Sequence, residues 1–455
     1  MLTALDALFS VFSDLVWSNV LWLLLAAGVF LLVYSRGLPY RYFGHALGVV
    51  SGRYDDREGP GQLTHFEALC AALSGTLGLG NIAGVAVAIA TGGPGAVFWM
   101  WLTALLGIGT KFFTCTLAVM YRGENSLGEV EGGPMYVIRE GLPKRWHGLA
   151  ILFCVAALFG SLPVFQVNQF VQIVRDVVAV PAGWTTTDAH LGFDLIAGGI
   201  VAVLVGAVLL GGVRRVGWAA ARVVPLMVVL YLLVIGVVLA THAARIPETF
   251  MRIVTDAFAF EAAAGGLLGS LLVGARQGAF SNEAGIGTEA LAHGDARTRV
   301  PAREGLVAMI GPVVDTLIVC TATALAILVT DVATAGGPNG VTLTARALEA
   351  GVGSAGPLLL VVLVALFSVS TMVTFGYYGA KCLGFLIGAE RQGAYYGFYL
   401  ALIVFGAVVT VEGAVGLLTG MYGLMAIPTV ISTVLLAPRV MAHAREYFGT
   451  LERGS

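Results

Sequence analysis

One stretch of the chain places flexible backbone and a polar side chain inside an apolar segment. It runs from Ser74 to Gly84 in the sequence SGTLGLGNIAG and holds four glycines and one asparagine between apolar flanks. Each glycine in a helix interior costs about 1 kcal/mol relative to alanine, so a continuous helix is not expected here. A break at membrane depth is tolerated where the freed backbone lines an enclosed cavity. We therefore predict a discontinuous transmembrane helix whose gap is a binding site.

Such a break offers two kinds of ligand from one backbone. The amides that start the outer half-helix, near Leu79–Asn81, lie at the positive end of a helix dipole and can bind a carboxylate. The carbonyls that end the inner half, near Ser74 and Leu77, lack helical partners and suit a hard cation such as Na⁺. The alternative is close helix packing through Gly80 and Gly84, which have GxxxG spacing. Packing explains these two glycines but not the asparagine between them.

A second glycine-rich span carries another polar cluster and ends in the sequence RQGAFSNEAGIG. We expect a break around Gly278 to Asn282 that presents carbonyls to an ammonium group, with Phe280 capping a small side chain. Glu283 should not face lipid, which favours an ion pair or a gate, with Arg276 as the candidate partner. A purely structural buried pair is the open alternative.

Other polar residues lie inside otherwise apolar segments. Gln166 is our candidate for a substrate contact, since polar side chains in a span usually face the bundle interior. We expect Asp315 either to pair with a neighbouring polar helix or to relay a proton. Ser370 and Thr371 are adjacent hydroxyls, and on their own they are better explained by hydrogen bonds to carbonyls of their own helix.

The composition places these residues in a membrane. Of the 455 residues, 58% are hydrophobic and 11% are charged, against about 25% charged in a soluble domain. We therefore predict an all-α polytopic membrane protein with a single transporter domain over residues 1–455. The net charge of −2 and the lack of a basic patch do not indicate a nucleic-acid partner. The five cysteines show no CxxC spacing and are expected to be buried core residues.

Eleven hydrophobic segments are long enough to cross a bilayer. They cover residues 15–34, 63–91, 94–121, 147–179, 191–213, 217–241, 262–293, 302–330, 355–387, 393–411 and 415–438. Residues 63–241 then form one five-helix unit and residues 262–438 a second, with 15–34 as an extra leading helix and 439–455 as a cytoplasmic tail. Each unit opens with a broken helix, and the two run in opposite directions, which is the pattern of a secondary transporter with an inverted repeat.

Positively charged residues set the expected orientation. Nineteen Lys and Arg residues fall on one side of the predicted spans, four fall on the other and two lie inside spans. The richer side is cytoplasmic by the positive-inside rule, so the N-terminus is expected outside and the C-terminus in the cytoplasm. The first fourteen residues carry no Lys or Arg, unlike a signal peptide, so the first span should be retained.

Other function classes find little support. All seven histidines lie in loops or at span ends, and no HExxH or GxSxG motif appears, so an integral-membrane enzyme is not expected. A channel needs a lined pore or filter, whereas two broken helices of opposite orientation favour alternating access. The lack of a nucleotide-binding loop disfavours ATP-driven transport.

Four motifs carry a family resemblance. The chain resembles the alanine or glycine:cation symporter family in GLGNIAGV (78–85), GGPGAVFWMW (92–101), GGPMY (132–136) and FSNEAGIG (280–287). The resemblance covers spans two to eleven. It implies the amino-acid transporter fold of the neurotransmitter-sodium symporters with one extra leading helix. It also implies cotransport of alanine or glycine, usually with Na⁺, across a prokaryotic plasma (inner) membrane.

The patterns and the resemblance together assign residues. The candidate substrate set is Gly78, Leu79, Gly80, Asn81, Gln166, Gly278, Phe280, Ser281, Asn282, Thr371 and Phe375. For Na⁺ the resemblance implies the carbonyls of Ser74, Leu77 and Phe367 with the hydroxyls of Ser370 and Thr371. An all-oxygen set without a carboxylate suits a monovalent ion. The implied partners are the amino acid, Na⁺ and the lipid bilayer, with no other cofactor, no ATP and no nucleic acid.

Two positions depart from the family's pattern. Leu79 stands where many members carry threonine, and Gly311 stands where an acid is expected before the proline. Glycine density and the phenylalanines predict a tight pocket for alanine or glycine. A proton-coupled amino-acid permease of the same fold remains the alternative. The patterns leave D/L selectivity, stoichiometry and oligomeric state open.

Overall fold

The protein is almost entirely helical, as its hydropathy predicts. This computed structural model describes residues 2–56, 58–259, 266–333, 340–409 and 412–454. The start of the predicted seventh span at residue 262 and the end of the tenth at residue 411 lie outside these ranges. Two short strands, β1 (Gly123–Glu124) and β2 (Val130–Glu131), pair antiparallel as one hairpin. The five cysteines are free and buried, as expected.

The helices of the first half cover the first six predicted spans and include short helices between them. They are α1 (Leu2–Ser35), α2 (Leu38–Arg41), α3 (Phe43–Val50), α4 (His65–Thr76), the π-helix η1 (Gly80–Gly84), α5 (Val85–Gly92), α6 (Ala96–Met120), α7 (Pro134–Gly141), η2 (Lys144–Trp146), α8 (Gly148–Gly160), α9 (Val164–Val174), η3 (Arg175–Ala179), α10 (Leu191–Leu209) and α11 (Gly212–Thr241). The predicted fourth span is divided into α8 and α9 near Pro163, whose ring lacks a backbone donor.

The helices of the second half begin with the short η4 (Ala243–Arg245) and α12 (Ile246–Ala257). They continue as α13 (Gly266–Asn282), α14 (Thr288–His293), α15 (Pro301–Ala308), α16 (Ile310–Pro312), the π-helix η5 (Val313–Cys320), α17 (Thr321–Val329), α18 (Val341–Val352), η6 (Gly353–Ala355), α19 (Gly356–Ile387), η7 (Ala389–Arg391), α20 (Gln392–Val408), α21 (Glu412–Leu424) and α22 (Ala426–Gly454). The segments from α15 to α17 together form one long apolar run, 301–329.

Within the described ranges, eight helices or helix runs are long and apolar enough to cross a membrane, and the bent pair of 65–76 with 80–92 makes nine. α13 and α20 lie over the predicted seventh and tenth spans but have 17 residues each, fewer than the about 20 of a typical span. The architecture is therefore that of a multi-pass helical membrane protein. The count of eleven spans and the inverted repeat stay predictions.

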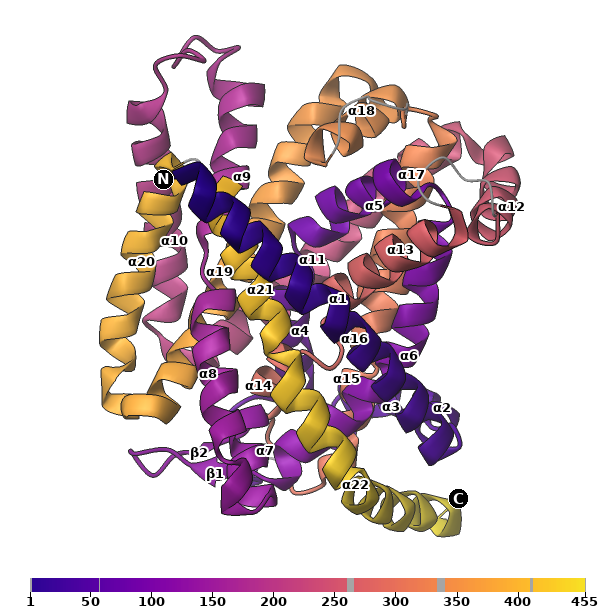
Figure 1. The fold of residues 1–455 in the computed structure, drawn as a ribbon, viewed down its shortest axis with the longest axis vertical. Coiled ribbons are helices and arrows are strands. Elements are labelled where there is room, and N and C mark those ends of the chain that lie inside the picture. Colours follow the sequence, from indigo (N-terminus) through magenta and orange to yellow (C-terminus); the bar gives the residue numbers. More distant parts are fainter. Residues whose placement is uncertain (1, 57, 260–265, 334–339, 410–411, 455) are drawn as a thin grey trace.

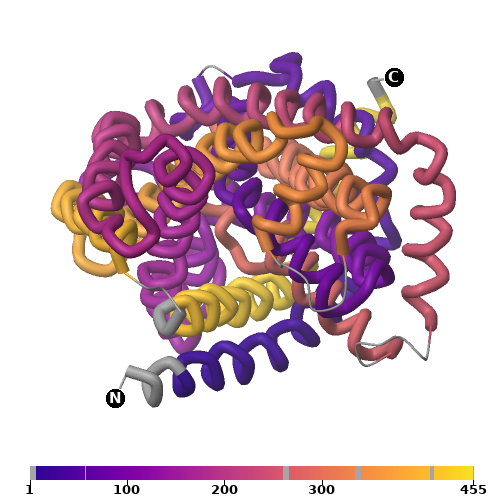
Figure 2. Tube along the Cα trace, turned by 90° about the horizontal axis from the view of Figure 1, so that it is seen from above, coloured from indigo at the N-terminus to yellow at the C-terminus, as the bar shows by residue number. Residues whose placement is uncertain are grey.

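The packing places both broken helices in the interior. α4 packs against α11, α14 and α19, whereas α13 packs against α5 and α6. α1 and α21 run along one another on one face of the bundle (Figures 1 and 2). α12 and α18 lie at one end of the molecule, and α2, α3 and the β1–β2 hairpin lie at the other (Figure 1). The two termini also lie at opposite ends in that view.

Candidate functional site

The first break falls where the glycine-rich run predicts it. α4 ends at Thr76, Leu77 is extended with φ −76° and ψ 94°, and η1 begins at Gly80. The two halves of this span are bent by 55°. The carbonyls that end one half and the amides that start the next are left without regular helical partners. π turns such as η1 are frequent at functional sites.

Asn81 supports this break from inside the protein. Its Oδ1 accepts a hydrogen bond from the Gly78 amide at 2.9 Å, and its Nδ2 donates to Asp315 Oδ1 at 2.6 Å. Ser281 donates to the other oxygen of Asp315 at 2.9 Å. Asn81 and Asp315 are fully buried. Both ends of the Asn81 side-chain amide are therefore used within the protein, and Asn81 is not among the residues that line the cavity. Asp315 is paired with polar neighbours on other helices, the first of its two predicted roles.

The second break falls later than predicted. α13 runs without interruption to Asn282, and the regular helix is lost only over the five residues that precede α14. In that segment Glu283 has φ +56°, Gly285 +84° and Gly287 +99°. The expected break between Gly278 and Asn282 is therefore wrong. Left-handed backbone, which glycine adopts without strain, turns the chain here instead.

The residues of the misplaced break have other roles. A Cβ on Gly278 would lie 3.0 Å from Met100 Cα, so this glycine lets α13 approach α6 closely. The Asn282 side chain accepts a hydrogen bond from the Ala284 amide at 3.0 Å, which supports the turn. Both residues are buried against the protein and are not among those that line the cavity.

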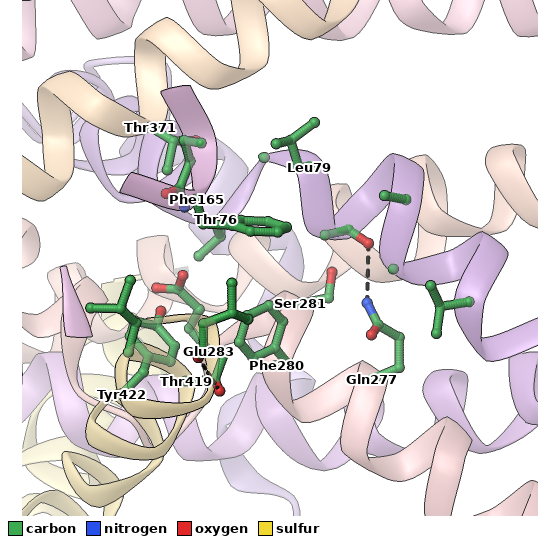
Figure 3. Close-up of a pocket in the computed structure, with 18 of the residues that line it drawn as sticks. Thr76, Leu79, Phe165, Gln277, Phe280, Ser281, Glu283, Thr371, Thr419 and Tyr422 are labelled. Atoms are coloured by element: carbon green, nitrogen blue, oxygen red, sulfur yellow. Dashed lines mark hydrogen bonds between the residues drawn. The ribbon is translucent and has the colours of Figure 1, made fainter. Parts of the chain in front are cut away.

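A cavity of about 520 Å³ lies between the two broken helices (Figure 3). Eight of the eleven predicted substrate residues line it: Gly78, Leu79, Gly80, Gln166, Phe280, Ser281, Thr371 and Phe375. Glu283 also lines it and is 4% exposed. The rings of Phe280 and Phe375 lie 5.7 and 6.1 Å from that of Tyr422, so aromatic side chains form much of one wall. The structure thus brings most of the predicted substrate set together.

Several lining residues were not predicted from the sequence. Trp17 of α1 and Thr419 and Tyr422 of α21 close one side of the cavity, and Phe165 and Gln277 line it from α9 and α13. The Trp17 indole donates to the Thr419 carbonyl at 3.0 Å. The leading helix, treated above as an addition to the transporter fold, therefore forms part of the site. The sequence signals that could have pointed to them were Trp17, which lies in an apolar span, and Tyr422, which lies in a glycine-rich one.

Arg276 was the candidate partner of Glu283, but the two do not pair. Its guanidinium lies 3.3 Å from Asp14 on α1, and the two side chains are 46% and 69% exposed. Arg276 also lines the cavity, so this pair lies at its mouth. Glu283 lies past the end of α13, and its carboxylate instead accepts a hydrogen bond from Thr288. The two charges are separated because the helix that carries Arg276 ends before Glu283.

Oxygen atoms of α4 and α19 converge beside the cavity. Thr371 Oγ1 lies 2.9 Å from the Phe367 carbonyl and 3.3 Å from the Leu77 carbonyl. Ser370 Oγ lies 3.1 Å from the same Phe367 carbonyl, and the Ser74 hydroxyl donates to the Ser370 carbonyl at 2.9 Å. A Cβ on Gly78 would lie 3.1 Å from Thr371 Oγ1, so a side chain there would crowd the group. The five oxygen-bearing residues assigned to Na⁺ are therefore neighbours, and hard oxygens suit that ion.

Buried polar contacts close the end of the bundle that carries α14 and α15. Lys381 Nζ lies 2.6 Å from Asp295 Oδ1 and 2.9 Å from the Leu291 carbonyl. The Glu304 carboxylate is held between the rings of His65 and His293. All these side chains are almost fully buried. None of these side chains lines the cavity, whereas the partly exposed Arg276 does.

Gly311, the second departure from the family's pattern, faces a buried cation. A Cβ at Gly311 would lie 3.2 Å from Lys111 Nζ, and Lys111 on α6 is 2% exposed. No hydrogen bond or ion pair of this ammonium is found with any residue that the structure describes. An acidic residue in place of Gly311 would stand directly against Lys111.

Comparisons with known proteins show the family of this chain. The profile of the sodium:alanine symporter family matches residues 2–455. The chain is 36% identical to the sodium/alanine symporter AgcS of Methanococcus maripaludis over 96% of this chain and 95% of that one. It is 34% identical to the probable sodium/glutamine symporter GlnT of Bacillus subtilis, covering 97% and 91% of the two chains.

Among solved structures, MhsT in complex with L-phenylalanine aligns with a TM-score of 0.55 at 15% identity, covering 85% of this chain and 98% of that one. This likeness shows a shared fold. The family match extends over nearly the whole chain and includes both broken helices. The protein is therefore a membrane transporter rather than an enzyme, and it belongs to the sodium:alanine symporter family.

Proposed function

We propose that this protein is a secondary active symporter that couples uptake of a small neutral amino acid, alanine or glycine, to the Na⁺ gradient by alternating access. The observation that carries the proposal is the group of oxygens from Leu77, Phe367, Ser370 and Thr371 next to the cavity. These oxygens come from the end of a half-helix and from a second helix packed against it. Such a junction suits a monovalent cation and is sensitive to relative movement of the two helices.

The substrate would lie between the two breaks. In this arrangement the free amides near Leu79 and Gly80 bind its carboxylate at the start of η1. The carbonyls at the end of α13, together with the Glu283 carboxylate, face its ammonium group. Phe280 and Phe375 enclose the side chain. Both ends of a zwitterion are then matched by partial or full charges of opposite sign.

Thr371 would couple the two ligands. It lines the cavity and also contacts the Leu77 and Phe367 carbonyls. An ion held by these oxygens would stabilise the end of α4 against α19, and with it the adjacent Leu79–Gly80 segment. Na⁺ would then favour the substrate-binding arrangement, and by linkage the substrate would favour Na⁺ binding to the same degree.

Counterflow in proteoliposomes tests this function. Liposomes loaded with unlabelled L-alanine should accumulate labelled L-alanine when Na⁺ is present on both sides, and should not when choline replaces it at fixed pH. Counterflow that persists without Na⁺, with net uptake into empty liposomes that an imposed proton gradient drives and a proton ionophore abolishes, would favour the proton-coupled alternative. Glycine and L-glutamine belong in the same competition series, since one relative is named a sodium/glutamine symporter.

The proposed topology has eleven spans, an inverted repeat over 63–241 and 262–438, and a cytoplasmic C-terminal tail. The asymmetric distribution of Lys and Arg supports an N-terminus outside and a C-terminus inside the plasma (inner) membrane. Reporter fusions after residues 36 and 439 should both report a cytoplasmic location, while a fusion after residue 183 should report the outside. A cytoplasmic signal at residue 183 would contradict this topology.

A further inference from the structure

Three side chains from three helices hold the π-helix η1 by its carbonyls. Gln277 Nε2 of α13 donates to the Gly80 carbonyl at 3.0 Å, Thr323 of α17 donates to the Asn81 carbonyl at 2.8 Å, and Thr344 of α18 donates to the Ile82 carbonyl at 3.1 Å. These donors, which we call the η1 collar, bind three successive residues. Three successive carbonyls of this widened turn beside the cavity are thereby bonded to three different helices.

Gln277 differs from the other two members of the collar. Thr323 and Thr344 are fully buried, whereas Gln277 is half-buried and lines the cavity. The dashed line at Gln277 in Figure 3 marks its bond to the backbone of η1. It lies one turn before Phe280 and Ser281, which also line the cavity. Gln277 therefore ties the side of the site formed by α13 to the side formed by η1.

Gly84 provides the groove in which this side chain lies. A Cβ at Gly84 would lie 2.2 Å from Gln277 Nε2, 2.8 Å from its Cδ and 2.9 Å from its Oε1. At Gly80 the nearest side-chain atoms to such a Cβ belong to Phe280, at 3.8 Å. Residues four apart share a helix face, so the Gly80–Gly84 pair, read above as a possible helix-packing motif, accepts an amide side chain.

We propose that Gln277 is a positioning residue for the substrate, which sets the distance between the Leu79–Gly80 amides and the end of α13. The proposal rests on the proposed function, since those two sides are the expected carboxylate and ammonium sites. Loss of the Gln277 bond would leave both half-sites intact but no longer fixed relative to one another. The cost would then appear in apparent substrate affinity more than in the maximal rate.

A rescue experiment tests the contact itself. Gly84→Ala should lower the thermal unfolding temperature of the purified protein, because the new methyl group overlaps the Gln277 amide. In the Gln277→Ala background the same change should have little further effect, since the overlapping atoms are gone. Gly199→Ala is the matched control, because nothing lies within 4 Å of a Cβ at Gly199. Equal, additive losses in both backgrounds would overturn the contact.

Transport kinetics test the positioning role, with labelled L-alanine as the probe. Gln277→Ala should raise the apparent KM about tenfold with a change in maximal rate below threefold. Gln277→Glu, which keeps the size but removes the donor, should do the same or worse. Thr344→Val removes another collar bond away from the cavity and should lower thermal stability while KM stays within twofold. An unchanged KM in Gln277→Ala, or an equal shift in Thr344→Val, would overturn the proposal.

If the wild type does not take up L-alanine, the proposed substrate fails, and the rescue experiment still decides whether Gln277 fills the Gly84 groove.

Discussion

The two broken helices are stabilised in different ways. Between α4 and η1 the break covers three residues, and none of these described residues has a positive φ. Side chains outside these three residues bind the polar atoms of the break. Between α13 and α14 the break covers five residues, and three of them have positive φ, Glu283, Gly285 and Gly287. The first break depends on side chains around it, whereas the second combines left-handed backbone with one bond from outside, which Thr429 of α22 donates to the Ile286 carbonyl.

Because of this difference, the two breaks offer different chemical groups to a ligand. The first presents backbone amides and carbonyls, because Asn81 and the η1 collar occupy the protein-facing side. The second presents a carboxylate, because the left-handed turn at Glu283 ends α13 beside the cavity. Substitutions in the first should therefore act through supporting side chains. Substitutions in the second should act through the charge that lines the cavity.

The largest expected effect comes from the charge of the second break. Glu283→Gln should lower transport of L-alanine about 100-fold, because a hydrogen bond to a charged group contributes up to about 3 kcal/mol. Counterflow at saturating Na⁺ measures it. Asp14→Asn, at the exposed mouth of the cavity, is the matched control and should change the rate less than threefold, since exposed ion pairs contribute little. A Glu283→Gln protein with near-wild-type transport would remove the proposed ammonium partner.

The second largest effect is expected on stability, and it compares two asparagines. Asn81 follows the first break, and Asn282 precedes the second. Asn81→Ala should lower the free energy of unfolding by about 2–3 kcal/mol, because the Gly78 amide and the buried Asp315 carboxylate each lose a partner. Asn282→Ala removes one bond to the Ala284 amide and should cost about 1 kcal/mol. Unfolding in detergent would compare the two. Equal losses would mean that the first break is no more dependent on its surroundings than the second.

A smaller effect is expected for the ion next to the first break. Thr371→Ala should raise the Na⁺ concentration for half-maximal L-alanine uptake about tenfold, which corresponds to about 1.4 kcal/mol. Ser368→Ala is the control on the same helix, because its hydroxyl is buried but has no hydrogen-bond partner among the described residues. A Na⁺ dependence that shifts equally in both variants would show a general effect of α19 rather than a ligand role for Thr371.

Glycine density predicts the first break correctly and misplaces the second, for a physical reason. Near Leu77 no neighbouring backbone needs the glycines for close packing along α4, so their low helix propensity ends the helix. In α13 the glycines serve close packing instead, since a Cβ on Gly274 would lie 2.1 Å from the Ala96 carbonyl. A glycine that permits a left-handed turn and a glycine that permits close approach look the same in a sequence.

The partners of the site residues were less predictable than the residues themselves. Asp315 lies 234 positions from Asn81, and only the folded chain shows that they meet. Trp17 lines the cavity because α1 packs along α21 and its indole bonds to Thr419. Hydropathy predicted that both helices exist, but it carries no information on which helices pack together or which face each of them turns inward.

The smallest effect on transport is expected at Gly278, which was assigned to the site from the sequence and lies outside the cavity. Gly278→Ala should lower the free energy of unfolding by about 1–3 kcal/mol, because the added methyl group meets Met100 and Thr103 of α6 at 3.0 Å. The KM for L-alanine should stay within twofold. Gly236→Ala, where a Cβ has open space, should change neither quantity. A selective rise in KM in Gly278→Ala would show that this residue belongs to the substrate site after all. It would also mean that α13 opens near its middle during transport, so that the second break resembles the first.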